Sequence, residues 1–106
     1  MSIALNLDER GLCASISGDI DHHNAKTIRE ALDRAVEKYL PCHLFIDLSD
    51  VTFMDSSGIG LVLGRYRNMS KRGKGLTVIV PQGRIRRILT MAAVDKLVTL
   101  TDTRII

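Results

Sequence analysis

The first residues of the chain alternate apolar and polar side chains with the period of a β-strand. Ile3, Leu5 and Leu7 alternate with small or polar residues, which predicts a strand with one buried face. A turn at Arg10-Gly11 separates it from a second apolar run over residues 12–17. The two runs together predict a β-hairpin.

Two longer segments repeat apolar residues every three or four positions, which is the spacing of a helix with one buried face. The first helix is expected after Asp21, a suitable N-cap residue, and before Pro41, which ends it. Its predicted buried residues are Ala25, Ile28, Leu32, Ala35, Val36, Tyr39 and Leu40. The second helix is expected to open at residues 55–57, with a buried stripe formed by Ile59, Val62, Leu63, Tyr66 and Met69.

The remaining apolar segments complete an alternation of strands and helices. Residues 43–48 form a short, largely apolar run of the kind found in central strands, and Ser49-Asp50 is expected to turn the chain. Residues 76–80 predict another strand, residues 85–92 a shorter helix and residues 97–100 a last strand. Repeated strand–helix–strand units indicate parallel neighbouring strands and an α/β layer architecture.

Composition and charge narrow the classes of function. The 106 residues fit one domain, and with 45% hydrophobic and 25% charged residues the chain is not of a disordered type. Only 4% of the residues are aromatic and Trp is absent, so the core must be aliphatic and few rings are available to stack on nucleic acid bases. A net charge of +3 suits an acidic protein partner or a phosphate-bearing ligand, but is too small to argue for nucleic acid.

The N-terminus and the cysteines point to a protein of the cytoplasm. The chain has no basic start followed by an apolar stretch, as a signal peptide would, and no run long enough to span a bilayer. We therefore expect a cytoplasmic protein without membrane contact. Cys13 and Cys42 are expected to be buried thiols rather than a disulfide.

The segment 53–60 (FMDSSGIG) carries the clearest candidate chemistry. Asp55, Ser56 and Ser57 lie where a loop meets a helix N-terminus, at which unpaired N–H groups and a positive dipole favour an anion. A phosphorylated serine, with about −1.5 to −2 charges, would be accommodated there. Gly58 and Gly60 would let another protein approach closely. The alternative is that the serines only cap the helix.

Three other patterns in the sequence each have a simpler explanation than a binding site. Gly58, Gly60 and Gly64 resemble a dinucleotide-binding loop, but the spacing is off by one and close helix packing explains them. Residues 19–23 (DIDHH) combine acids and histidines, yet no second cluster supplies further metal ligands, which favours capping and surface histidines. The basic residues of the second and third helices are either a solvated face or a docking surface for an acidic partner.

Three segments together resemble a known family: 17–23 (SGDIDHH), 53–60 (FMDSSGIG) and 63–66 (LGRY). They resemble the STAS-domain anti-sigma factor antagonists. The first segment, with its Asp-His-His tripeptide, and the third, with Gly-Arg-Tyr, are similar to the sporulation branch of this family rather than to its stress-response branch. The resemblance covers nearly the whole chain. It implies one STAS domain over residues 1–106 with an α/β fold, a mixed sheet of four to five strands and helices packed mainly on one face.

The resemblance also implies a mechanism and a set of partners. Family members bind an anti-sigma factor that is also a serine protein kinase, and the unphosphorylated antagonist frees the sigma factor. The kinase phosphorylates the first serine of the motif, Ser56 here, and a protein phosphatase restores it. ATP and magnesium belong to the kinase, so no cofactor, metal, catalysis or direct nucleic acid contact is expected of this chain. The residues expected to bind the partner are Asp21, His22, His23, Asp55, Ser56, Ser57, Gly58, Ile59, Gly60 and Arg65.

One departure and three alternatives accompany this resemblance. Relatives usually continue into a C-terminal helix, whereas this chain stops at residues 102–106, so a last helix is expected to be short, absent or trimmed. The main alternative is a STAS scaffold or sensor without a phosphorylation switch, binding a nucleotide or other small ligand. A small enzyme using Asp55 and Ser56 with a histidine, and a basic nucleic-acid binder, are the other two.

Overall fold

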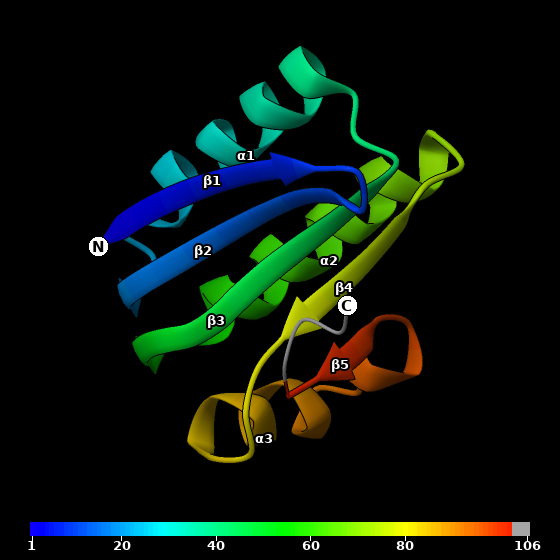
Figure 1. Ribbon diagram of the computed structural model, residues 1–106. Helices are drawn as coiled ribbons and strands as arrows, with labels where there is room; N and C mark the ends of the chain where they lie inside the picture. Colours follow the sequence, from blue (N-terminus) through cyan, green and yellow to red (C-terminus); the bar gives the residue numbers. More distant parts are fainter. Residues whose placement is uncertain (103–106) are drawn as a thin grey trace.

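The computed structural model describes residues 1–102 and contains one five-stranded sheet. Its strands follow the chain order β1-β2-β3-β4-β5 (Figure 1). β1 pairs with β2 antiparallel and every other pair is parallel, which confirms the predicted mixed sheet. The strands are β1 (Ser2–Asp8), β2 (Gly11–Ile20), β3 (His43–Met54), β4 (Gly75–Ile79) and β5 (Thr99–Thr101).

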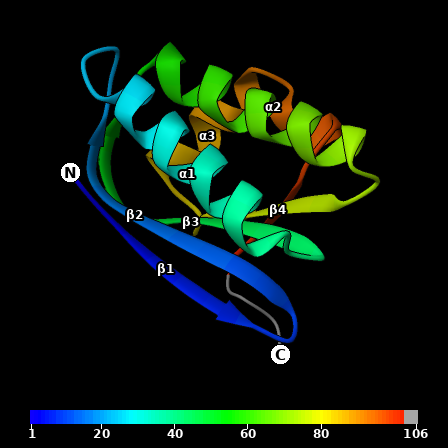
Figure 2. The same cartoon turned by 90° about the horizontal axis from the view of Figure 1, so that it is seen from above.

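The helices lie together on one face of this sheet (Figure 2). They are α1 (Ala25–Tyr39), α2 (Ser56–Lys71), α3 (Arg84–Met91) and a short 3₁₀ helix, η1 (Val94–Lys96). Crossovers between parallel strands are right-handed, and here each crossover moves to the next strand in the same direction. Right-handed steps in one direction always place the connecting helix on the same side, which explains the one-sided arrangement.

The core lies between the sheet and the helices and is aliphatic, as the composition predicted. Alternate residues of the central strands, such as Ala14 in β2 and Ile46 in β3, are fully buried under the helices. α1 contributes Ile28 and Leu32 to the same cluster. The partly covered positions around the core include Ile3, Ile59, Leu63, Tyr66, Ile85, Ile88 and Leu100.

The long strand β3 corrects the prediction of a turn at Ser49-Asp50. β3 continues through both residues to Met54, and its pairing with β2 shifts register between Ser15 and Ser17 and again after Gly18. Such bulges absorb extra residues while the strand goes on. The polar pair therefore marks a bulge and not a turn, and the extension of β3 carries the chain directly to the start of α2.

The first strand also differs from its prediction. Leu5 and Leu7, expected on a buried face, are 46% and 48% exposed. β1 is the edge strand of the sheet, and α1 does not cover it fully. At the end of α1, Tyr39 and Leu40 are 40% and 67% exposed although they continue the apolar stripe. A periodic pattern locates a strand or helix, but coverage depends on the neighbour that the fold supplies.

Two smaller corrections concern α2 and the C-terminal part. The side chains buried by α2 are centred on Leu61, Val62 and Met69, so Ile59, Leu63 and Tyr66 flank the buried stripe. The last strand is Thr99–Thr101, after η1, instead of residues 97–100. The expectation about a terminal helix concerns positions 103–106, which lie outside the described residues.

The cysteines are both free thiols, but only one is buried. Cys13 is buried in β2, whereas Cys42, expected to be buried as well, is exposed before β3. Its Sγ lies 3.5 Å from the backbone oxygen of Arg10. Along residues 1–102, no helix is both long and apolar enough to cross a membrane.

Candidate functional site

α2 begins at Ser56, directly after Asp55, in agreement with the predicted opening of this helix at residues 55–57. The backbone of Asp55 is extended, and its Oδ1 accepts a hydrogen bond of 2.8 Å from the backbone N–H of Ser57. The Asp55 N–H donates to the carbonyl of Ile20, which ties the start of α2 to the end of β2. Asp55 therefore acts as an N-cap and supplies an acceptor to one of the unpaired donors of the first turn.

The two serines of the motif differ in exposure. Ser56, the first residue of α2, is exposed, whereas Ser57 is half-buried and its N–H is held by Asp55. A kinase can reach a hydroxyl group only where it is accessible. The exposure of Ser56 agrees with its choice over Ser57, which rested on the family resemblance.

The glycines that follow have separate roles. Gly58 is buried, and a Cβ there would come within 2.3 Å of the Cγ of Met54. The sequence expectation that Gly58 leaves room for a partner is therefore replaced by a packing role against the core. Gly60 is exposed, and a Cβ there would meet no atom within 4 Å. Gly60 is thus the position at which the surface of α2 is open.

The start of α1 is organised by Asp21 and Asn24. Asp21 Oδ1 accepts from the backbone N–H groups of His23 and Asn24, at 2.9 and 3.1 Å. Asn24 Oδ1 accepts in return from the N–H of Asp21 at 3.0 Å. This reciprocal pair is a capping box. It encloses a turn before α1, which begins at Ala25, so Asp21 caps that turn and Asn24 occupies the N-cap position of the helix.

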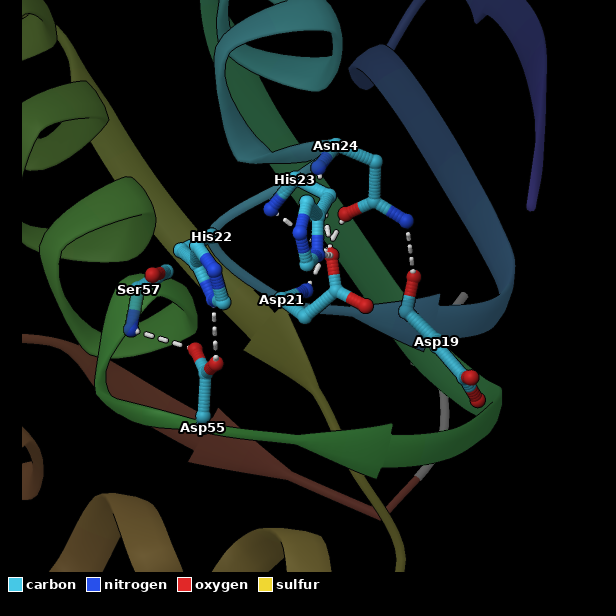
Figure 3. A network of polar contacts seen from close by, with 7 residues as sticks. All are labelled: Asp19, Asp21, His22, His23, Asn24, Asp55 and Ser57. Carbon is cyan, nitrogen blue, oxygen red and sulfur yellow. Dashed lines mark hydrogen bonds and ion pairs between the residues drawn. The ribbon is translucent and has the colours of Figure 1, made fainter.

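His22 and His23 lie between the two helix starts (Figure 3). Their rings lie with centroids 4.0 Å apart and planes tilted by 37°, and their side chains are 73% and 81% exposed. The Nδ1 of His22 lies 3.8 Å from Oδ2 of Asp55. The capped turn thus places His22 next to Asp55, at the start of α2. Among residues 1–102 no group of three or more His, Cys, Asp and Glu side chains is placed to hold a metal ion.

The electrostatics of the site centre on Asp55. The hydrogen bond from the Ser57 backbone lowers the pKa of Asp55, with smaller contributions from the Ser57 side chain and from His22, while desolvation opposes them. Hydrogen bonds donated to a carboxylate favour its charged form. Asp55 is therefore a carboxylate at neutral pH, directly beside Ser56.

Arg65 is the predicted site residue that the fold places apart from the others. It lies about two and a half turns along α2 from Ser56. It is only 7% exposed, with its Nε 2.9 Å from Oδ1 of Asp33 on α1, although these atoms do not form a hydrogen bond of acceptable geometry. Burial lowers the pKa of Arg65; the carboxylate of Asp33 opposes this effect, and the nearby Arg29 adds a smaller lowering. Its contacts join α1 to α2.

Three features near the site were not predicted: the exposure of Phe53 within the segment 53–60, and the positions of Lys26 and Arg29. Phe53, at the end of β3, is 43% exposed, which is unusual for a large apolar side chain in a strand. Lys26 and Arg29 of α1 line a groove together with Ser57 and Gly60 of α2. An exposed aromatic residue next to the motif was a signal available in the sequence. The groove was not, because it depends on how two helices pack.

Comparisons with known proteins agree with this geometry. The family model described as STAS domain matches residues 2–104. A protein from Paenibacillus polymyxa named anti-sigma F factor antagonist is 31% identical over 94 residues, which cover 89% of this chain and 80% of that protein. An anti-sigma factor antagonist from Mycobacterium paratuberculosis has a solved structure with a TM-score of 0.88 at 27% identity, covering 96% of this chain and 86% of that chain.

A second solved structure shows the same fold. It is the structure of the anti-sigma factor antagonist SpoIIAA in its unphosphorylated form, with a TM-score of 0.79 at 24% identity. It covers 94% of this chain and 88% of that chain. Together with the helices on one face and the mixed sheet, this similarity confirms the predicted STAS fold.

Proposed function

The chain belongs to the STAS domain family, and on this basis we propose that it is an anti-sigma factor antagonist switched by phosphorylation of Ser56. The observation that carries the proposal is the exposed Ser56 at the start of α2, beside the carboxylate of Asp55. The partner is an anti-sigma factor, which we propose is also the serine kinase. A protein phosphatase reverses the modification.

The unphosphorylated form binds its partner through the joined starts of α1 and α2. Ser56, His22 and His23 are exposed there, with Asp55 held in place by its cap. The capping box orders residues 21–24 before any partner arrives. A surface that is already ordered loses little conformational entropy on binding. Binding to the anti-sigma factor releases the sigma factor.

Phosphorylation weakens this complex by charge. A phosphate on Ser56 adds about −1.5 to −2 charges next to the Asp55 carboxylate. In the free protein, solvent and the N-terminus of α2 accommodate them. In an interface both charges must be desolvated, which is costly without matching cations. A loss of about 2.8 kcal/mol would reduce the affinity about a hundredfold.

No refolding is required for the switch. Ser56 is exposed, so a phosphate there displaces no core side chain. The proposal makes the chain a bacterial phosphoprotein of the cytoplasm that acts by binding and performs no catalysis itself. Its motifs favour sporulation control over stress control. The supporting residues are the DHH tripeptide at 21–23 and the LGRY segment at 63–66.

The test measures binding to the cognate anti-sigma factor with and without ATP and magnesium. Calorimetry should show that Ser56→Ala binds in both conditions, whereas the wild type loses affinity as Ser56 becomes phosphorylated and Ser56→Asp binds weakly throughout. Ser57→Ala is the matched control and should still be modified, as seen by intact mass. If Ser56→Asp bound as tightly as wild type, the charge mechanism would be wrong. If the wild type gained no phosphate, a STAS scaffold without a switch would be the better description.

A further inference from the structure

A groove lies between the first turns of α1 and α2, next to the candidate phosphorylation site. Its volume is about 290 Å³. The residues lining it are Ala25, Lys26, Arg29, Ser57, Gly60 and Leu61. Gly60 keeps it open, since a Cβ there would project into free space. The groove is therefore continuous with the surface formed by residues 55–60.

The charge of this groove has one sign. Lys26 and Arg29 are both exposed on α1, and none of the described lining residues is acidic. Asp33, one turn beyond Arg29, lies instead against the buried Arg65. Arg29 and Arg65 are close enough that their repulsion helps to lower the pKa of Arg65. The positive charge of the groove is thus left for a ligand to neutralise.

We propose that this groove receives acidic side chains, Asp or Glu, of the anti-sigma factor. A carboxylate entering between the helices would meet the two cations on one side and the first turn of α2 on the other. The positive end of α2 adds to the attraction, while the Asp55 carboxylate that caps this end opposes it, so the attraction depends on Lys26 and Arg29. The inference rests on the proposed function, because it names the chemistry of the partner at the same surface. It adds a contact that is independent of Ser56.

The positive charge of the groove should also affect how fast the complex forms, before the two proteins are in contact. Exposed cations of this kind act mainly on the rate of association, by steering an oppositely charged partner. The modification of Ser56 then acts against the same attraction from a neighbouring position. The groove thus contributes to partner recognition, while Ser56 decides whether the recognised partner is retained.

The experiment compares two double variants of α1 with equal charge loss. Lys26→Gln/Arg29→Gln removes the cations of the groove. Arg34→Gln/Lys38→Gln removes two cations of the same helix that lie beside Leu5 and Tyr39 instead. At low salt, binding to the cognate anti-sigma factor should weaken about tenfold in the first variant, mostly through the association rate, and less than about twofold in the control. In about 0.5 M salt the affinities of the two variants for the anti-sigma factor should become similar, because salt screens the charges of the groove.

A double-mutant cycle identifies the occupant. Neutralising each surface Asp and Glu of the anti-sigma factor in turn should reveal at least one acid whose loss no longer matters once Lys26 and Arg29 are replaced. The inference is overturned if both double variants bind equally, or if no partner acid couples to the groove. In either case wild-type binding and its loss on phosphorylation would leave the proposed function standing. Failure of the wild type to bind any anti-sigma factor would overturn both.

Discussion

The helices α1 and α2 both follow an aspartate that caps the chain, but the two aspartates are held in different ways. Asp21 accepts two backbone N–H groups and receives a return bond from Asn24, so that its turn is closed on itself. Asp55 accepts the backbone N–H of Ser57 with Oδ1, and its second oxygen faces His22, whose backbone N–H and ring also favour the carboxylate. The first arrangement is self-contained, and the second leaves part of the carboxylate available.

This difference distinguishes the start of α1, where the cap has a structural role, from the start of α2, where the cap lies beside the candidate phosphorylation site. A closed capping box fixes the turn that presents His22 and His23, whereas the single cap of α2 leaves Ser56 exposed beside a charge. The same residue type therefore stabilises one helix and sets the electrostatics of the other. Substitutions at each start should reveal this difference in stability and in titration.

The largest effect is expected where α2 rests on the core. Gly58→Val places a branched side chain against Met54 and Ile20, where even a Cβ is too close, and should destabilise the protein by about 2 kcal/mol or more. Gly60→Val makes the same change in the same helix, in open space, and is the matched control. Urea denaturation measures both. Equal losses in the two variants would show that packing under Gly58 is not the cause.

A smaller loss is expected from the closed start. Asp21→Ala removes the acceptor of two backbone N–H groups and leaves Asn24 without its reciprocal partner, and should cost about 1 to 2 kcal/mol in the free energy of unfolding. Asp21→Asn keeps a side-chain oxygen and should lose much less. Equilibrium unfolding in urea gives both values. An Asn variant as unstable as the Ala variant would contradict the capping role.

The charge of Asp55, at the start of α2, should make the stability of the protein depend on pH. The lowered pKa of Asp55 means that the folded state favours the carboxylate. The stabilisation that the Asp55 carboxylate gives to the folded state is therefore complete above the ordinary carboxyl pKa of about 4. It is lost as the pH falls through the lower pKa of the folded protein. Asp55→Asn, which does not titrate, should be less stable than wild type at neutral pH, by less than Asp21→Ala. Denaturation curves across the acid range should converge, and a difference that does not change with pH would be evidence against this assignment.

The smallest effect concerns the histidine between the two starts. His22 lowers the pKa of Asp55 through its backbone N–H and, as the smallest cause, through its ring charge. His22→Ala keeps the backbone N–H and removes only the ring charge, so it should raise that pKa slightly. His23→Ala is the control, since the ring of His23 lies beside Asp21. Titration of the Asp55 carboxyl followed by NMR separates the two. A larger rise in the pKa of Asp55 for His23→Ala than for His22→Ala would contradict the assignment of this effect to His22.

Much of this molecule follows from patterns of nearby residues in the chain. The alternation of strands and helices, the aliphatic core and the opening of the second helix at residues 55–57 all depend on local spacing or composition, and each was predicted. The cap itself is Asp55, whereas the sequence had suggested the serines as caps. The extension of β3 through Ser49 was not, because the bulges that allow it involve pairing with β2. The exposure of Leu5 was missed for a related reason, since it depends on how far α1 reaches over β1.

The candidate site shows the same contrast between features that depend on nearby residues and features that depend on packing. The motif locates the start of α2, and the tripeptide at 21–23 locates the turn before α1. That these two lie side by side follows from the pairing of β2 with β3, which sequence periodicity does not encode. The burial of Gly58 and Arg65 and the groove beside Lys26 likewise arise from packing between segments that are distant in the chain.

The agreement between strand order and chain order has a consequence for synthesis. As the chain leaves the ribosome, each new strand finds its partner already present, in the strand that emerged before it. No early segment has to wait unpaired for a late one, as happens when a central strand comes last. Each parallel strand pairs with the strand that precedes it in the chain, so each pairing needs only one crossover connection to close. The sheet can therefore assemble strand by strand, in the order in which the chain is synthesised.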